Sequence, residues 1–173
     1  MSYRNTILLS LFFTVLYLKI SDQADAVISA KDLKDLRGCW QGSLTYLDYS
    51  SNKPYTMNAD LKVSRTGRSH TFILENIYPQ EPKANSSDTI IISSDGRKIN
   101  DEIVHSKLKN ADGSLEIITE KEGLDGNDNK PATFRFTYTI GKKSYIHKKE
   151  VRFDGQQEWI KRHEYNYSRA SCK

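Results

Sequence analysis

Tyrosine and histidine are the side chains of this sequence best suited to ligand chemistry. The chain has ten tyrosines, and Tyr46, Tyr138 and Tyr145 fall in extended segments where they can face inward. A tyrosine offers apolar area and one hydrogen-bonding tip, which suits a ligand of mixed polarity. His147 shares a strand face with Tyr145 and can hydrogen-bond the same ligand. Ordinary filling of a core is the alternative explanation for these rings.

Two cofactor chemistries involve neighbouring residues. His147 and His163 carry imidazoles of the kind that ligate haem iron, although a histidine is more commonly packed in a core or exposed. The loop DGNDN at 125–129 has oxygen-bearing side chains at its first, third and fifth positions, as calcium loops do, but Lys130 stands where such a loop needs glycine. We therefore expect no cofactor and no metal ion.

The motifs of known enzyme active sites are missing from the sequence. It contains no Gly-x-Ser-x-Gly elbow, no His-Glu-x-x-His and no glycine-rich phosphate loop. Asp48 can face inward from a first strand, but general acid-base catalysis needs a positioned partner for that carboxylate. We therefore predict no catalytic residue and expect that the protein is not an enzyme.

Strands must position these side chains, because apolar residues recur with a period of two from Gly38 onward. Residues 55–64 are the clearest case, with apolar side chains at the odd positions and polar ones at the even positions. This alternation is typical of a half-buried antiparallel strand. Turn residues interrupt the pattern every 8 to 14 positions, which favours an all-β fold.

Tight turns join the predicted strands. Glycine follows aspartate at Asp95-Gly96, Asp112-Gly113 and Asp154-Gly155, and Gly141-Lys142 separates two further extended runs. The last strand is expected from about Gln156 to Tyr167, which gives eight or nine strands in sequence-neighbour order. Such a series removes its two free edges only by closing, so we predict a single up-and-down antiparallel β-barrel.

A short helical turn precedes the predicted barrel. The segment DLKDL at 32–36 is expected to plug one end, with Leu33 and Leu36 facing inward. Gly38, Cys39 and Trp40 then form a Gly-x-Trp unit that opens the first strand. This start resembles that of the calycins, the lipocalin-like superfamily. The stretch at 40–57 is also similar to small exported bacterial calycin-like proteins of undefined function.

The resemblance implies which residues close the barrel. In lipocalins the tryptophan closes the barrel floor, and an arginine of the final strand packs across it. The likeness therefore assigns barrel closure to Gly38, Trp40 and Arg162, with Arg169 as the second candidate for the arginine. Trp40 also shares its face with Gly42, which places a large ring beside a small residue, as a tapering barrel end requires.

The N-terminus is typical of a signal peptide. Arg4 precedes an apolar run at 7–18, and Ala24-Asp25-Ala26 supplies a small-x-small cleavage pattern. The run is too short to span a membrane, which takes about 20 apolar residues. We therefore expect a signal peptide over 1–26 and one exported barrel domain over 27–173, either secreted or periplasmic.

Cys39 and Cys172 stand near the two ends of that domain. Export permits a disulfide, and the first and last strands of a closed barrel are neighbours. A bridge would staple this seam and remove loop entropy worth on the order of 5 kcal/mol from the unfolded chain. A disulfide is favoured, with two free thiols as the alternative.

Charge is weak overall but unevenly distributed. The net charge of +4 does not by itself indicate nucleic-acid binding. Residues 135–162 carry eight Lys or Arg and three acids, whereas residues 100–130 carry eight acids and four Lys. Solvated strand faces of opposite sign account for this, and the alternative is a docking surface for an anionic protein or surface.

We expect an exported β-barrel that holds one small, partly apolar molecule. The residues predicted to line its interior are Tyr46, Tyr138, Tyr145, His147 and Arg162. The alternative is a protein-binding module, such as a secreted or periplasmic inhibitor, that uses its outer face or mouth loops. A void among the inward side chains favours the first function, whereas close contact among them favours the second.

Overall fold

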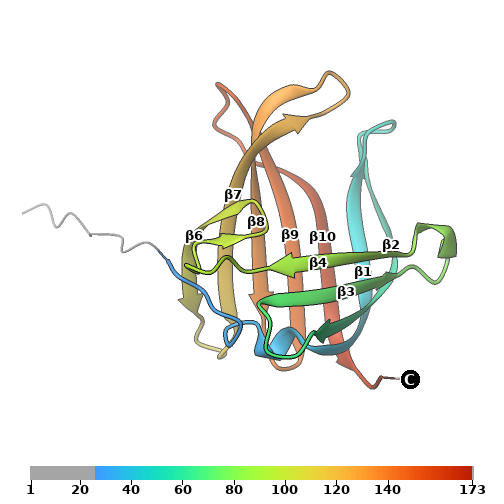
Figure 1. Ribbon diagram of the computed structural model, residues 1–173. Helices are drawn as coiled ribbons and strands as arrows, with labels where there is room; N and C mark the ends of the chain where they lie inside the picture. Colours follow the sequence, from blue (N-terminus) through green and yellow to red (C-terminus); the bar gives the residue numbers. More distant parts are fainter. Residues whose placement is uncertain (1–25, 173) are drawn as a thin grey trace, which may run out of the picture.

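The protein is an all-β molecule whose antiparallel strands form one sheet that curls into a nearly closed barrel (Figure 1). The computed structural model describes residues 26–172. Within this part of the chain, helix is limited to two 3-10 turns, η1 (Lys34–Leu36) and η2 (Pro82–Ala84). The prediction of an all-β antiparallel barrel is therefore confirmed.

The described residues form ten strands. In chain order they are β1 (Gly38–Asp48), β2 (Lys53–Arg65), β3 (Thr71–Ile77), β4 (Ser86–Ile91), β5 (Lys98–Ile99), β6 (Glu102–Lys109), β7 (Leu115–Asp125), β8 (Lys130–Ile140), β9 (Ser144–Phe153) and β10 (Ile160–Ala170).

The strand number differs from the expected eight or nine because one extended run is broken. Asn100 adopts a left-handed conformation with a φ of 53° and turns the chain between β5 and β6. Asparagine tolerates this conformation better than most residues do. The final strand also begins later than expected, at Ile160 instead of about Gln156.

The first and last strands lie side by side, as predicted. The sheet order is β4-β3-β2-β1-β10-β9-β8-β7-β6-β5, so β1 stands between β2 and β10. The β1–β10 register runs from Cys39 opposite Ala170 to Tyr46 opposite His163. The two edges of the sheet are β4 and β5. A β-bridge between Ile92 and Ile99 joins them, together with backbone hydrogen bonds from Ser93 to Lys98 and from Asn100 to Ile91.

Gly42 allows β10 to approach β1 closely. A Cβ atom at this position would stand 1.9 Å from the carbonyl oxygen of Asn166 and 2.9 Å from the Cα of Tyr167. Both contacts are with backbone, which cannot move aside as a flexible side chain can. The absence of a side chain at Gly42 therefore sets the spacing at the seam of the barrel.

We expect Gly42→Ala to destabilise the protein by at least about 2 kcal/mol, because the added methyl group forces the two seam strands apart. Urea denaturation would measure the loss. The adjacent variant Ser43→Ala is the control and should change stability by less than about 0.5 kcal/mol. Equal stabilities of Gly42→Ala and the wild type would contradict the close approach.

A disulfide between Cys39 and Cys172 links the ends of the barrel domain and confirms the predicted bridge. The two cysteines are 133 residues apart in sequence, and their Cα atoms are 5.2 Å apart. The bridge therefore closes nearly the whole barrel into one loop. In the chain-entropy view, a loop of this length restricts the unfolded state strongly.

Replacing both cysteines with serine should lower the free energy of unfolding by about 2–5 kcal/mol. The comparison is a urea titration of the double variant beside the oxidised and the reduced wild type. The reduced wild type and the double variant should unfold at the same urea concentration. Coincident unfolding of the oxidised wild type and the double variant would show that the bridge adds no stability.

The lower end of the barrel is built around Trp40. Its ring is 1% exposed, and its Nε1 donates a hydrogen bond to the carbonyl oxygen of Leu36 in η1 at 2.8 Å. Leu33 and Leu36 are fully buried in the same core. The turn thus joins the core through its leucines and one backbone carbonyl.

Arg169, and not Arg162, lies across this tryptophan. The Arg169 guanidinium carbon is 3.8 Å from the centre of the Trp40 ring, and its nitrogens donate to the carbonyl oxygens of Asp35 and Arg37. The expected role of Arg162 is therefore wrong. The start of β1 must face the end of β10 in an antiparallel seam, and Trp40 is paired with Arg169.

Gly38 lies beside the Arg169 guanidinium at the lower end of the barrel. It has a φ of +118°, which L side chains rarely adopt, and a Cβ atom there would stand 2.7 Å from an Arg169 nitrogen. Gly38 therefore leaves room for the arginine that covers Trp40.

The wall of the barrel has unequal height. β3 pairs only with the Asp60–Arg65 part of β2, and β6 pairs with β7 only from Leu115 to Glu120. The remaining parts of β2 and β7 therefore rise above the front strands, as Figure 1 shows around β3 and β4. This leaves the barrel open at its upper end, opposite η1.

The predicted signal peptide, except for Ala26, lies outside the described residues. Between residues 26 and 172 the structure has no helix with the length and hydropathy needed to cross a membrane.

Candidate ligand-binding site

A set of aromatic side chains forms the inner face of β8, β9 and β10. The register places His147 of β9 between Tyr138 of β8 and Tyr165 of β10. The His147 ring centre is 4.5 Å from that of Tyr138 and 6.2 Å from that of Tyr165, with interplanar angles of 16° and 8°. The three rings are therefore nearly parallel neighbours.

Two more tyrosines extend this arrangement toward the floor. Tyr145 and Tyr167 have ring centres 5.9 Å apart and planes 8° apart, and Tyr167 is similarly aligned with Tyr165. We call these five residues the aromatic wall: Tyr138, Tyr145, His147, Tyr165 and Tyr167. Because side chains stand roughly perpendicular to a sheet, the polar tips of the wall point into the barrel.

A cavity of about 410 Å³ lies against the aromatic wall. This volume falls in the range that small-molecule sites occupy. Its lining residues are Leu74, Asn76, Asp88, Thr89, Ile90, Asn100, Glu102, Tyr138, Tyr145, His147, His163 and Tyr165. Most of them carry a hydrogen-bonding group, so the cavity offers more than an apolar surface.

Glu102 supplies a buried carboxylate to this interior cavity. It is 6% exposed, and its Oε2 accepts hydrogen bonds from the hydroxyls of Thr119 at 2.5 Å and Tyr138 at 3.0 Å. Burial raises the pKa of Glu102, and the two hydroxyl donors oppose part of that increase. The pair of hydrogen bonds fixes the hydroxyl of Tyr138 on the carboxylate.

Two buried polar atoms of the wall have no hydrogen-bond partner among residues 26–172. They are the hydroxyl of Tyr145 and the Nε2 of His147. An unpaired buried polar group costs about 1–3 kcal/mol, so native proteins rarely leave one unused. Because both side chains line the interior cavity, a molecule bound there could supply the missing partners.

The histidines of the site are neutral near pH 7. Burial lowers the pKa of His147 to about 3, and repulsion by His163 in its protonated form lowers it further. Burial also lowers the pKa of His163 to about 4, with a smaller effect from Lys149. A neutral imidazole has one donor and one acceptor nitrogen, so His147 can serve a ligand by hydrogen bonding without attracting it by charge.

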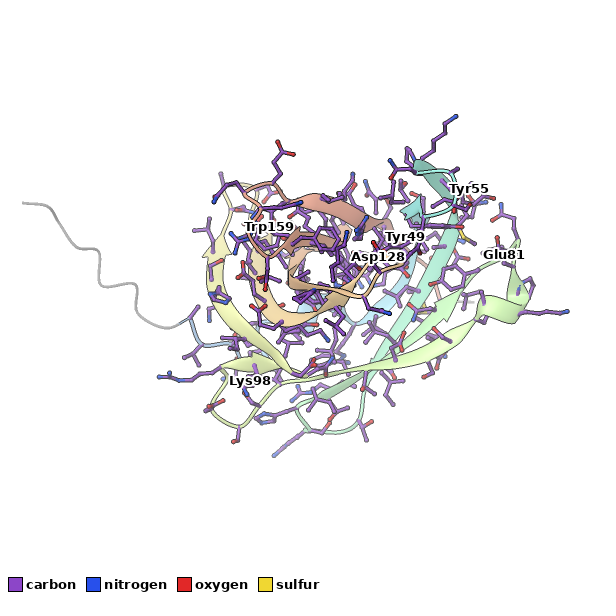
Figure 2. The ribbon with its side chains drawn as sticks, turned by 90° about the horizontal axis from the view of Figure 1, so that it is seen from above. Tyr49, Tyr55, Glu81, Lys98, Asp128 and Trp159 are labelled. Carbon is purple, nitrogen blue, oxygen red and sulfur yellow. A yellow bond between two sulfur atoms is a disulfide. The ribbon has the colours of Figure 1, made fainter. Side chains whose placement is uncertain are left out.

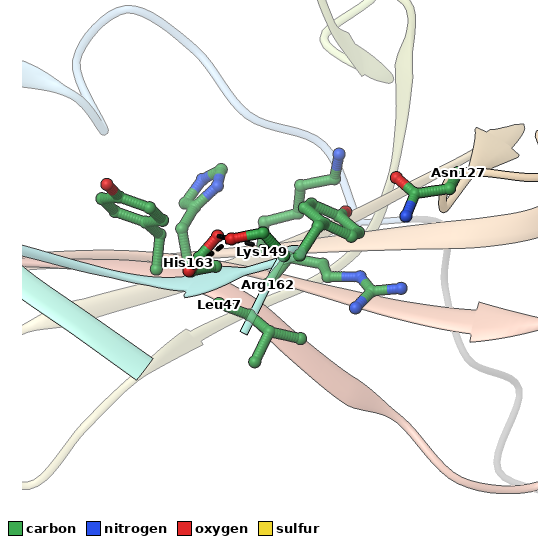
Figure 3. A pocket seen from close by; sticks show the side chains of 9 residues that line it. Leu47, Asn127, Lys149, Arg162 and His163 are labelled. Carbon is green, nitrogen blue, oxygen red and sulfur yellow. Dashed lines mark hydrogen bonds between the residues drawn. The ribbon is translucent and has the colours of Figure 1, made fainter. Parts of the chain in front are cut away.

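A second pocket, the mouth pocket, occupies about 600 Å³ at the open end. Its lining residues are Tyr46, Leu47, Asp48, Tyr49, Ser50, Asn127, Lys149, Arg162 and His163 (Figure 3). His163 also lines the interior cavity, so the two spaces meet at this imidazole. Seen from above, Tyr49 and Asp128 lie over the interior, whereas Glu81 and Lys98 lie at the outer edge (Figure 2).

Arg162 is held at the mouth by a nearly buried ion pair. Its Nη2 is 2.6 Å from Asp125, whose carboxylate also accepts a hydrogen bond from Tyr49 at 3.1 Å. The register of β10 shifts between Lys161 and His163, so Arg162 is the extra residue of a bulge. Bulges redirect side chains, and here the bulge accompanies an arginine turned toward β7. The same pair engages the Asp125 carboxylate of the loop with calcium-like spacing.

The structure divides the predicted interior residues between the two spaces. Tyr138, Tyr145 and His147 line the interior cavity, whereas Tyr46 and Arg162 line the mouth pocket. Three further buried side chains, Ala59, Leu61 and Phe136, belong to the packed core and do not line the interior cavity. The interior is therefore filled in part and hollow in part.

Sequence reasoning missed Glu102 and Lys149. Glu102 lies in an acidic region that was attributed to solvated strand faces, yet its alternation with buried Val104 places it inside. Lys149 lies two residues after His147 and so shares its inward face. Strand alternation was the available signal in both cases, but a charged residue in a basic or acidic segment is normally assigned to the surface.

Comparison with known proteins gives similarity in fold alone. No family model and no curated protein matches this chain. Among solved structures it is similar to Rv2717c from M. tuberculosis, with 14% identity, 83% of this chain and 99% of that chain covered, and a TM-score of 0.47. It is also similar to the S-type phycobiliprotein lyase CPES from Guillardia theta, with 8% identity, coverage of 84% and 95%, and a TM-score of 0.49.

The second of these structures is named a lyase, and the prediction that the protein is not an enzyme is not retained. The prediction relied on missing sequence motifs. Such motifs are local, whereas a barrel gathers its interior groups from separate strands, as it does here for Glu102 and His147. Their absence is therefore a poor guide for this fold.

His147 should make stability depend on pH. The unfolded chain takes up the proton near pH 6.5, whereas the folded protein does so only near pH 3. The contribution of His147 to the free energy of unfolding is thus fully present above about pH 6.5 and is lost as the pH falls toward 3. His147→Phe keeps a ring but removes the titrating group. Between about pH 6.5 and 5.5 its free energy of unfolding should therefore fall by about 1 kcal/mol less than that of the wild type.

Urea unfolding curves over this pH range would test the expectation. The exposed His70 provides a matched control for the substitution itself, as His70→Phe. His163 still titrates in the His147 variant, so part of the pH dependence remains. Identical pH dependence in His147→Phe and the wild type would show that the His147 imidazole is not desolvated.

Proposed function

We propose that the protein binds one small molecule of mixed polarity inside the barrel. The observation that carries the proposal is the pair of unpartnered buried atoms, the Tyr145 hydroxyl and the His147 Nε2, beside a cavity of about 410 Å³. The rings of the aromatic wall would cover the apolar part of such a molecule. Its hydrogen-bonding groups would satisfy the polar tips.

The ends of the barrel have different roles in this proposal. The turn η1 acts as a plug, because its leucines and the Trp40 hydrogen bond fill the lower end. The upper end is open, since β3 and β6 cover only part of β2 and β7. A ligand would therefore enter past the mouth pocket and stop at the aromatic wall.

We further infer that the protein is exported. The leader-like sequence at 1–26 and the Cys39–Cys172 disulfide support this location, because disulfides persist in oxidising compartments. The alternative function, a protein-binding module with a basic outer face, has less support. Arg135 and Lys148 of that face are paired with Glu120 and Glu150 at 2.7 Å and 3.0 Å.

Native mass spectrometry would test the binding proposal on protein purified gently from its own host. The wild type should retain a small molecule as added mass. Leu74→Trp places an indole in the cavity and should abolish the added mass. Ile73→Trp, on the opposite face of β3, is the matched control and should retain it.

Two outcomes would overturn the proposal. One is a bare polypeptide mass for the wild type in repeated gentle preparations. The other is retention of the added mass by Leu74→Trp, which would place the molecule elsewhere. Tyr145→Phe removes only one hydroxyl and so tests the same site without filling it; added mass should be retained less firmly in this variant.

A further inference from the structure

Lys149 is a charged side chain on the inner face of the barrel. The register places it between Phe136 of β8 and His163 of β10, both of which face inward. The neighbouring residues Lys148 and Glu150 point to the other face and pair with each other at 3.0 Å. Lysine rarely occupies an interior position without a partner, so this placement requires an explanation.

Aromatic rings, and not carboxylates, are the close partners of the Lys149 ammonium. Its Nζ is 4.0 Å from the ring centre of Phe134 and 5.9 Å from that of Phe136. No carboxylate between residues 26 and 172 lies within ion-pair distance of it. Burial lowers the pKa of Lys149. The charge of Asp125 raises this pKa, and that of Lys121 lowers it. An anion beside the ammonium would oppose that effect.

The other charged groups of the mouth pocket are already engaged. Arg162 is paired with Asp125 at 2.6 Å. Asp48 accepts hydrogen bonds from the hydroxyls of Ser50 and Ser51 in its own turn, the latter at 2.6 Å. Lys149 is therefore the cation of this pocket that is left for an incoming group.

Lys149 also lies at the right depth to meet a molecule held by the aromatic wall. It lines the mouth pocket with His163, and His163 lines the interior cavity with His147. His147 and His163 have ring centres 5.9 Å apart. In Figure 3 the side chains of Lys149 and His163 lie on the same side of the strands, away from Leu47.

We propose, building on the binding function above, that the ligand carries one anionic group, a carboxylate, sulfonate or phosphate, and that Lys149 binds this group at the mouth. The apolar body of the ligand then lies along the rings, and its neutral polar end reaches His147 and Tyr145. Lys149 thereby selects an anionic molecule over a neutral one of the same shape.

Two fluorescent dyes with the same ring skeleton test this selectivity. 8-Anilinonaphthalene-1-sulfonate carries a negative charge, and N-phenyl-1-naphthylamine is neutral. The wild type should bind both and prefer the sulfonate. Lys149→Met should weaken sulfonate binding about tenfold or more, which corresponds to the loss of a charge-assisted hydrogen bond, and change binding of the neutral dye by less than about twofold.

Lys148→Met is the matched control, because this residue is adjacent in sequence but points outward. It should leave both affinities unchanged. Added salt should weaken sulfonate binding to the wild type but not to Lys149→Met. If Lys149→Met fails to fold, as circular dichroism would show, Lys149→Gln and the salt series on the wild type give the same comparison.

The outcomes separate the two proposals. Failure of the wild type to bind either dye would contradict the binding function and the anion site together. Binding of both dyes with equal affinity, or a Lys149→Met variant that keeps the sulfonate preference, would contradict the anion site alone. Loss of both dyes in a folded Lys149→Met variant would show that Lys149 shapes the cavity and does not select charge.

Discussion

The pairing of β1 with β10 is the constraint on which the rest of the structure depends. Its register sets Trp40 beside Arg169 at the floor and Tyr46 beside His163 at the mouth. Side chains alternate between the two faces of a strand, so a slip of one residue would turn the whole inner face of β10 outward. The bare Gly42 backbone and the Cys39–Cys172 bridge both act on this seam. The same contact thus closes the barrel and aligns the aromatic wall.

Neighbouring strands are joined more firmly at some places around the barrel than at others, and this difference suits the proposed binding site. The seam between β1 and β10 has a long ladder and a covalent bridge, whereas β4 and β5 are joined over a short stretch around the Ile92–Ile99 bridge. The aromatic wall stands on the long strands β8, β9 and β10, which hold its rings in place. The opposite side of the cavity is made by the short front strands. Under the proposed binding function, a rigid wall that faces a less firmly joined one would let a ligand enter without disturbing the groups that recognise it.

The sequence allowed much of the fold to be predicted, because alternation and turn residues are local signals. Residues 55–64 show this directly, since the alternating stretch lies entirely within β2. The ion pair of Arg162 was not predictable in this way, since it depends on a bulge at one position of β10 and on a carboxylate from β7. Glu102 was missed for a similar reason. Its burial is stabilised by hydroxyls from β7 and β8, and no residue near Glu102 in the sequence indicates that these donors are its partners.

The chemistry of the wall also limits what the cavity can hold. Were its interior only a hydrophobic void, a wholly apolar molecule would be the best occupant, since burial of apolar area would be the main gain. The Tyr145 hydroxyl and the His147 Nε2 change that balance, because an apolar occupant would leave both without a partner. Each unpaired group costs as much as the burial of roughly one to four methylene groups contributes. A molecule with well-placed polar atoms would therefore gain over an apolar one of equal size, and the proposed binding would discriminate by hydrogen bonding inside an aromatic enclosure.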